Sequence, residues 1–114
     1  MLLCSEQAQG SANRLEVVQR LLWWLLVGTR GGPTRARIIH SLEKNPQNAN
    51  QLAQTLGLDY KTIRHHLQIL VENRFLVTAG NGYAKVYFPS PVLESCYETF
   101  LEIWKKIEKD FQLG

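Results

Sequence analysis

The segment from Gln51 to Leu70 constrains the fold of this chain more than any other part of the sequence. It divides into two stretches of helical spacing, separated by Gly57, Leu58 and Asp59. Leucine, isoleucine and alanine recur on one side of each stretch, so both helices are expected to pack against a common core. Two short helices joined by a turn that contains glycine form a helix-turn-helix. The segment therefore predicts a small helical domain built around this motif.

The second of these helices is expected to run from an N-cap at Asp59 to about Asn73, and its outward side is polar. The outward residues are Tyr60, Lys61, Arg64 and His65. A helix with such a side fits the major groove of DNA. Arg64 has the paired donors that bind guanine, and Lys61 is better suited to a phosphate. A solvated helix surface would have the same pattern, but DNA contact is the favoured interpretation.

Positive charge is concentrated around the same helices. The whole chain has a net charge of +3. Residues 33–89 contain seven basic and three acidic residues, a net charge of +4. Residues 90–114 contain three basic and five acidic residues, a net charge of −2. Neutralisation of phosphates is therefore expected on the central part of the chain and not on its last helix.

The helix before the motif is expected to start after Thr34 and to end at the Asn45–Asn48 segment, with Asn50 as the N-cap of the next helix. Arg35 and Arg37 lie in its first turn, where positive charge opposes the helix dipole. Because that placement is unfavourable for stability, both arginines are candidates for contact with phosphate.

A β-hairpin is expected directly after the motif. Asn81 and Gly82 favour a two-residue type I′ turn, which needs positive φ at both central residues. With that turn the apolar residues on one side would pair as Phe75–Phe88, Val77–Val86 and Ala79–Ala84. Such a hairpin is a wing, with Tyr83 and Lys85 near its tip. Lys85 is a candidate for contact with the DNA backbone or minor groove.

The two ends of the chain are expected to form helices over residues 13–28 and 90–112, the second opened by Ser90 as its cap and Pro91. Both are more apolar than one small domain needs, so a second copy of the chain is the simplest cover for them. The candidate dimer residues are Leu22, Trp23, Trp24, Leu26, Tyr97, Phe100, Leu101 and Trp104. A ligand pocket at the tryptophans is the less favoured alternative, and no effector is identified.

The remaining candidate residues are given structural interpretations. His66 is expected to be a partly buried, hydrogen-bonded histidine, because it lies one turn after Ile63 and beside Leu67. A metal site at His65 and His66 is disfavoured, since neighbouring helix residues point about 100° apart. Cys96 is expected to be an inert buried thiol, and a redox pair with Cys4 is disfavoured.

Several classes of protein are not expected. The longest unbroken apolar run has seven residues, Leu21–Val27, whereas a membrane span needs roughly 20. The first residues lack the pattern of a signal peptide, and the two cysteines are too few for a disulfide framework, so a cytoplasmic location is expected. No phosphate-binding glycine loop, nucleophile elbow or His-Glu metal motif occurs, so neither an enzyme nor a cofactor is expected.

Three pieces of the sequence resemble the ArsR family of bacterial and archaeal repressors. They are TRARIIHSL (34–42), NQLAQTLGLDYKTIRHHLQIL (50–70), and ENRFLV followed by a wing that ends in VYF (72–88). The resemblance implies one winged-helix domain over residues 1–114, with its core at 34–89. That fold is mainly α with a small β-hairpin, a winged helix-turn-helix with additional N- and C-terminal dimerisation helices.

The same resemblance implies a function. Family members bind double-stranded DNA as homodimers, usually to repress, through the outward side of the recognition helix, which adds Thr62 to the candidate contacts. Metal sensing is not implied, because the family's Cys-x-Cys is missing and the histidines lie at 40, 65 and 66. The alternative is a winged helix that serves protein assembly or architecture without specific DNA readout.

Overall fold

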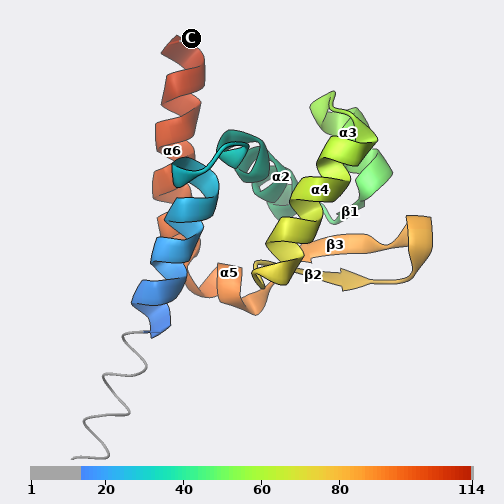
Figure 1. Ribbon diagram of the computed structural model, residues 1–114, viewed down its shortest axis with the longest axis horizontal. Coiled ribbons are helices and arrows are strands. Elements are labelled where there is room, and N and C mark those ends of the chain that lie inside the picture. The colour runs from blue at the N-terminus through green and yellow to red at the C-terminus, as the bar shows by residue number, and fades with distance from the viewer. Residues whose placement is uncertain (1–13, 114) are drawn as a thin grey trace, which may run out of the picture.

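The computed structural model describes residues 14–113 as a mainly helical domain with one small sheet (Figure 1). A helix over residues 14–23 continues into the π-helical turn η1. The labelled elements are η1 (Trp24–Gly28), α2 (Gly32–Lys44), β1 (Gln47–Asn48), α3 (Ala49–Leu56), α4 (Tyr60–Glu72), β2 (Leu76–Ala79), η2 (Gly82–Ala84), β3 (Val86–Pro89), α5 (Pro91–Ser95) and α6 (Tyr97–Leu113). The predicted fold class is confirmed.

The helices α2, α3 and α4 form the core of the domain, and local sequence fixes most of their ends. Asn48 caps α3, because its side chain accepts from Gln51 N and the Gln51 side chain accepts from Asn48 N. This reciprocal capping box satisfies two free donors, so the predicted cap at Asn50 is wrong by two residues. Gly57, with a φ of 66°, ends α3 in the left-handed conformation that glycine adopts easily.

Helix α2 begins at Gly32, whereas the sequence predicted a start after Thr34. Gly31 has a φ of 84° and turns the chain between η1 and α2. Pro33 lies in the first turn, where its missing N–H costs nothing because that donor has no partner inside the helix. The turn brings η1 against α2.

The sheet has the strand order β1-β3-β2, with both pairs antiparallel. β1 was not expected from the sequence, and it pairs Gln47 with Tyr87. Gln47 is buried, and its side chain binds Ser41 Oγ at 2.9 Å and Thr55 Oγ1 at 3.1 Å. These two contacts tie the strand to α2 and α3, so long-range packing and not local propensity determines it.

The predicted hairpin register is wrong by two residues. The observed partners are Ala79–Val86, Thr78–Tyr87, Val77–Phe88 and Leu76–Pro89. The type I′ turn does not form, because Asn81 is extended, with a φ of −132°, and a 3₁₀ turn follows at η2. A shift of two keeps every residue on its side of the ribbon. Leu76 and Tyr87 lie on the buried side, whereas Val77 is exposed.

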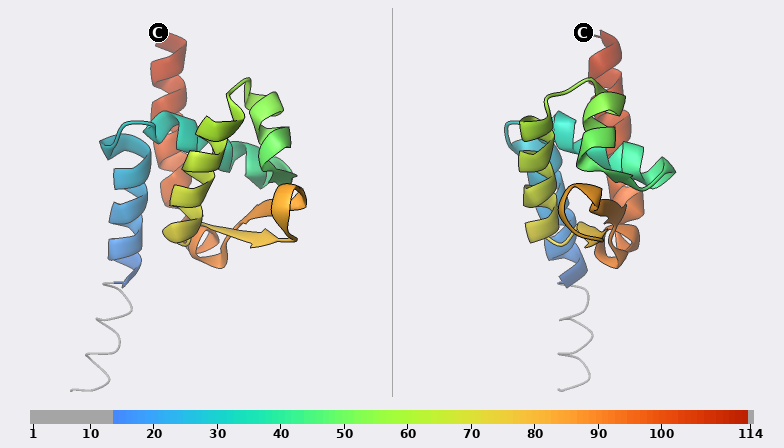
Figure 2. Two further views of the ribbon diagram at one scale, coloured as in Figure 1. Left: turned by 45° about the vertical axis from the view of Figure 1, so that its right-hand side comes forward. Right: turned by 90° about the vertical axis from the view of Figure 1, so that its right-hand side faces the viewer.

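The C-terminal segment is two helices, so the single helix predicted over residues 90–112 is wrong. The cap is confirmed, because Ser90 Oγ accepts from Leu93 N at 3.1 Å and Pro91 follows at the first position. The chain bends at Cys96, where φ is −122°. In both figures α5 lies near the sheet and α6 then rises beside the N-terminal helix (Figures 1 and 2). Gln19 Nε2 donates to Thr99 Oγ1 at 3.1 Å between these two helices.

Candidate nucleic-acid interface

Asp59 is the N-cap of helix α4, as predicted. The Asp59 carboxylate accepts from Lys61 N at 3.1 Å and from Thr62 N at 3.3 Å. It satisfies two of the free donors at the helix start and opposes the helix dipole. The cap therefore stabilises the start of α4 at this residue.

The two sides of α4 are separated as the sequence predicts. Ile63, Leu67 and Leu70 are fully buried in the core. Lys61, Thr62, Arg64, His65 and Gln68 are exposed. The exposed set is rich in hydrogen-bond donors. Base edges and phosphates carry acceptor atoms that can bind such donors.

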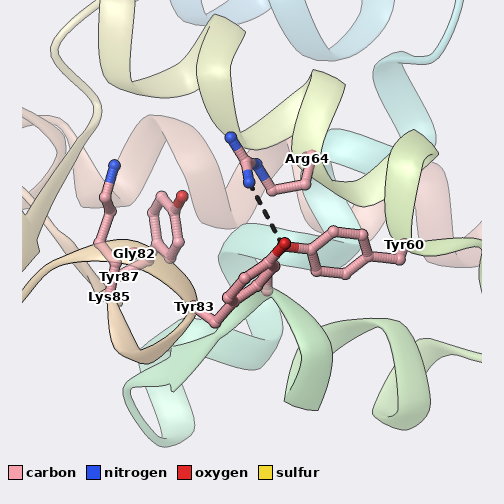
Figure 3. A pocket seen from close by; sticks show the side chains of 7 residues that line it. Tyr60, Arg64, Gly82, Tyr83, Lys85 and Tyr87 are labelled. Carbon is pink, nitrogen blue, oxygen red and sulfur yellow. Dashed lines mark hydrogen bonds between the residues drawn. The ribbon is translucent and has the colours of Figure 1, made fainter.

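The wing lies beside this exposed side and shares a cavity with it (Figure 3). The cavity has a volume of about 140 Å³. It is lined by Ala49, Tyr60, Arg64, Gly82, Tyr83, Lys85 and Tyr87. Arg64 from α4 and Lys85 from the wing thus face one hollow whose lining contains no carboxylate. An anion is the ligand that would relieve the repulsion between these two cations.

Arg64 is held by Tyr60, its neighbour one turn earlier. Its Nη1 donates to Tyr60 Oη at 3.3 Å, and its guanidinium carbon lies 5.9 Å from the centre of the Tyr60 ring. The hydrogen bond to Tyr60 raises the pKa of Arg64, so the guanidinium stays charged. Tyr60 itself is half-buried and packs against the core.

A second groove along α4 shows a residue that the sequence reading missed. Gln68 is exposed one turn beyond Arg64 and lines this groove with Thr78 and Lys85 of the wing. Its Nε2 donates to Glu72 Oε1 at 2.9 Å. The four-residue spacing from Arg64 was the available signal, because residues i and i+4 lie on the same side of a helix.

Comparison with protein families finds one matching model. Residues 32–77 match the family described as "Bacterial regulatory protein, arsR family". The matched residues run from the start of α2 into β2 and include the whole of α4. The match includes the helix-turn-helix formed by α3 and α4, so this part of the chain is similar to that family of regulatory proteins.

Solved structures share this fold across most of the chain. A probable transcriptional regulator from Pseudomonas aeruginosa is 19% identical with a TM-score of 0.62, over 94% of this chain and 83% of the other. The AntR antimony-specific transcriptional repressor is 27% identical with a TM-score of 0.61, over 87% and 86%. A homodimeric domain of a possible ArsR-family regulator from Mycobacterium bovis is 13% identical with a TM-score of 0.59, over 89% and 85%. The search of curated proteins gives no significant match.

Arg35 is not part of the exposed surface, so its predicted contact with phosphate is wrong. Only 3% of the residue is exposed. Its Nε donates to Leu25 O at 3.0 Å, and its Nη2 donates to Arg30 O at 3.2 Å and to Thr29 Oγ1. These bonds consume the donors that a phosphate would need. Arg35 therefore satisfies open carbonyls within η1 and just after it.

His66 is the partner of Arg35 on the recognition helix. Arg35 Nη1 donates to His66 Nδ1 at 3.1 Å, and since arginine has no acceptor, Nδ1 is unprotonated. Burial, followed by the charge of Arg35 and by His65, lowers the pKa of His66. The prediction of a structural, hydrogen-bonded histidine is confirmed.

Arg37 is half-buried, and its Nη2 donates to Leu56 O at 3.2 Å. The bond satisfies a carbonyl at the end of α3 and ties α2 to that helix. The remaining donors of Arg37 are unassigned, and its contact with phosphate stays a prediction.

The predicted dimer residues separate into three groups by exposure. Leu22, Leu26 and Phe100 have no exposed surface within one chain, so they belong to the core of the protomer and the prediction is wrong for them. Trp24 is 59% exposed and Leu101 is 38% exposed. The residues between these extremes are Trp23, Tyr97 and Trp104, all half-buried. Sequence spacing alone does not distinguish a side chain that faces its own core from one that faces a partner.

Within residues 14–113, no three histidine, cysteine, aspartate or glutamate side chains are grouped so as to hold a metal ion. In the same part of the chain, no helix is long and apolar enough to cross a membrane. Cys96 is buried, as predicted, and burial raises the pKa of its thiol. Cys4, the other member of the disfavoured redox pair, lies outside the described residues.

Proposed function

We propose that the chain is a homodimeric, sequence-specific repressor that binds a pseudo-palindromic DNA site. The observation that carries this proposal is the exposed, donor-rich side of α4 beside a wing with a cation on the same cavity. Neither feature alone requires DNA. Together they match a helix that enters the major groove while the wing reaches the adjacent backbone.

The side chains would divide the work between affinity and specificity. Arg64 would bind guanine through two donors, and Thr62 and His65 would contact neighbouring base edges. Lys61 at the helix start and Lys85 on the wing would bind phosphates, with Arg37 as a further candidate. Tyr60 binds Arg64 through its hydroxyl within this arrangement.

Exposed apolar side chains support a dimer. Among the described residues, large exposed hydrophobic side chains occur mainly on the N-terminal helix, η1 and α6, and they are Leu15, Val17, Trp24, Val27 and Leu101. A second copy would cover this surface, with Trp23, Tyr97 and Trp104 at its edge. The solved domain from Mycobacterium bovis is homodimeric, and AntR is a repressor. Two recognition helices would then enter major grooves about 34 Å apart.

The proposal is tested by selecting binding sites from random duplex DNA at physiological salt. We expect enrichment of an inverted repeat with half-sites about one helical turn apart. Sedimentation of the free protein at micromolar concentration is expected to give twice the mass of one chain. Binding without sequence enrichment would contradict specific readout and favour the architectural or protein-binding alternative.

Two substitutions test the site itself. Arg64→Ala and Lys61→Ala together are expected to abolish binding to the selected site, and Arg64→Ala alone is expected to reduce discrimination at one base pair by about 1–3 kcal/mol. Lys109→Ala removes an exposed lysine of α6 and serves as the control. Unchanged binding of the double variant, measured by fluorescence anisotropy, would contradict the assignment of α4 as the reading element.

A further inference from the structure

We infer that Tyr60 is a positioning residue that acts on DNA readout through Arg64, rather than by touching a base itself. The inference rests on the proposed function, because it concerns how the same site reads sequence. The sequence reading placed Tyr60 among the direct contacts. Its surroundings in the structure give it a different role.

Tyr60 is fixed at its base. It is the first residue of α4, directly after the Asp59 cap, and its ring packs against the buried core. Such packing restricts the orientations that the Tyr60 side chain can adopt before any ligand binds. A restricted side chain can in turn orient a neighbour that binds it.

Arg64 is the neighbour whose side chain Tyr60 orients. The residue is exposed, and an exposed arginine samples many rotamers. The 3.3 Å hydrogen bond to Tyr60 Oη and the ring 5.9 Å from the guanidinium carbon hold one end of the side chain. This single bond leaves four of the five guanidinium donors free for a ligand. Tyr60 thus restricts Arg64 without consuming its capacity to bind.

The wing completes the arrangement (Figure 3). Tyr83 lies with its ring centre 6.5 Å from that of Tyr60, at an angle of 39°. Tyr83 is 84% exposed, so it borders Tyr60 without burying it. Arg64 and Lys85 line the same cavity as these two rings.

The consequence is a separation between specificity and general affinity. A pre-positioned guanidinium loses less freedom when it forms two hydrogen bonds to one base. Contacts with phosphate do not depend on that geometry. Loss of the tyrosine hydroxyl should therefore weaken binding to the cognate site and leave binding to unrelated DNA unchanged.

Tyr60→Phe is the first test, since it removes only the hydroxyl. We expect affinity for the selected site to fall about 3- to 10-fold, as for the loss of one hydrogen bond. Affinity for unrelated duplex DNA, and the slope of log affinity against log salt, should not change. Lys109→Ala, at an exposed position of α6 away from this cavity, is the control and should have no effect. An equal loss on cognate and unrelated DNA would overturn the inference.

A double-mutant cycle tests whether Tyr60 acts through Arg64. In an Arg64→Ala background, Tyr60→Phe should cause no further loss of affinity for the selected site. The same fold-loss in both backgrounds would show that Tyr60 acts on its own and would overturn the inference.

A measurement without DNA separates this inference from the proposed function. Side-chain ¹⁵N relaxation of Arg64 Nε in the free protein should show greater motion in Tyr60→Phe than in the wild type. Identical relaxation would overturn the positioning role whatever the protein binds. Conversely, absence of sequence preference in the wild type would contradict the proposed function, while the relaxation result would still decide the role of Tyr60.

Discussion

Arg35 of α2 and Arg64 of α4 are both held by hydrogen bonds, and they differ in how many donors those bonds leave free. Arg35 donates to Leu25 O, Arg30 O, Thr29 and His66, and is 3% exposed. Among the described residues, Arg64 donates only to Tyr60, and it is exposed. A buried guanidinium must have its donors satisfied by the protein, whereas an exposed one can keep them for a ligand.

The comparison shows that charge type and position near a helix start do not identify a DNA contact. Both arginines lie in the first two turns of their helices, and both were candidates from the sequence. What distinguishes them is the number of donors that the fold already uses. Desolvation lowers the pKa of Arg35, while the bond to Tyr60 raises the pKa of Arg64.

The largest expected effect is on stability at Arg35. Arg35→Ala should lower the free energy of unfolding by about 3 kcal/mol, because it leaves buried acceptors on η1 and His66 without a partner. Arg64→Ala should change it by less than about 0.5 kcal/mol, as at other exposed positions. Urea denaturation followed by circular dichroism measures both. Equal losses for the two variants would remove the distinction between a structural and a ligand-binding arginine.

Gly31 gives the next largest effect, because it lies against the Arg35–His66 pair. A Cβ at Gly31 would lie 2.6 Å from His66 Cε1, and the residue also has a φ of 84°. Gly31→Ala should therefore lower the free energy of unfolding by about 2 kcal/mol, because it adds both the strain of the left-handed conformation and the overlap with His66. Gly57→Ala is the matched control, since Gly57 has a φ of 66° and open space around it, and about 1 kcal/mol is expected. Thermal unfolding of both variants would show whether the contact with His66 matters, and equal shifts in Tm would say that it does not.

The smallest effect is the pH dependence of stability. His66 has a lowered pKa in the fold, so the unfolded chain binds more protons than the native protein at mildly acidic pH. Stability from this residue is present above about 6.5, the ordinary histidine pKa, and is lost as the pH falls through the lowered value. His66→Asn keeps an acceptor near the Nδ1 position but does not titrate, and should reduce this dependence.

His40 also has a lowered pKa, through burial and then Lys44, so a part of the dependence should remain in His66→Asn. Denaturation curves between pH 5 and pH 8 measure the difference. Parallel curves for the wild type and His66→Asn would show that the contact with Arg35 does not depend on the neutral imidazole.

Much of the structure of α4 and its exposed side was predictable from local sequence. Asp59 as the cap of α4, the burial of Ile63 and Leu67, and the exposure of Lys61 and Arg64 follow from helical spacing and capping chemistry. The cap at Ser90 follows in the same way. Such features are decided within about one turn of helix, so the residues that determine them are adjacent in the sequence.

The features that were missed depend on contacts between distant residues. The wing register differs from the prediction because Gly80, Asn81 and Gly82 permit several types of turn. In the observed register, β3 pairs with both β1 and β2. The bend at Cys96 occurs without a helix-breaking residue, where α5 gives way to α6. Neither the wing register nor the bend at Cys96 is determined by residues adjacent in the sequence.

The sequence by itself determined the helix-turn-helix, the start of α4 and the side that α4 exposes, because these depend on interactions over three or four residues. Only the tertiary structure decided that Arg35 is buried and hydrogen-bonded to His66. It also decided that Leu22 and Phe100 face the core of their own chain. The contact that holds Arg64 against Tyr60 beside the wing depends on the packed fold in the same way. Burial and donor satisfaction are properties of the packed chain, since they depend on which distant groups arrive at the same place.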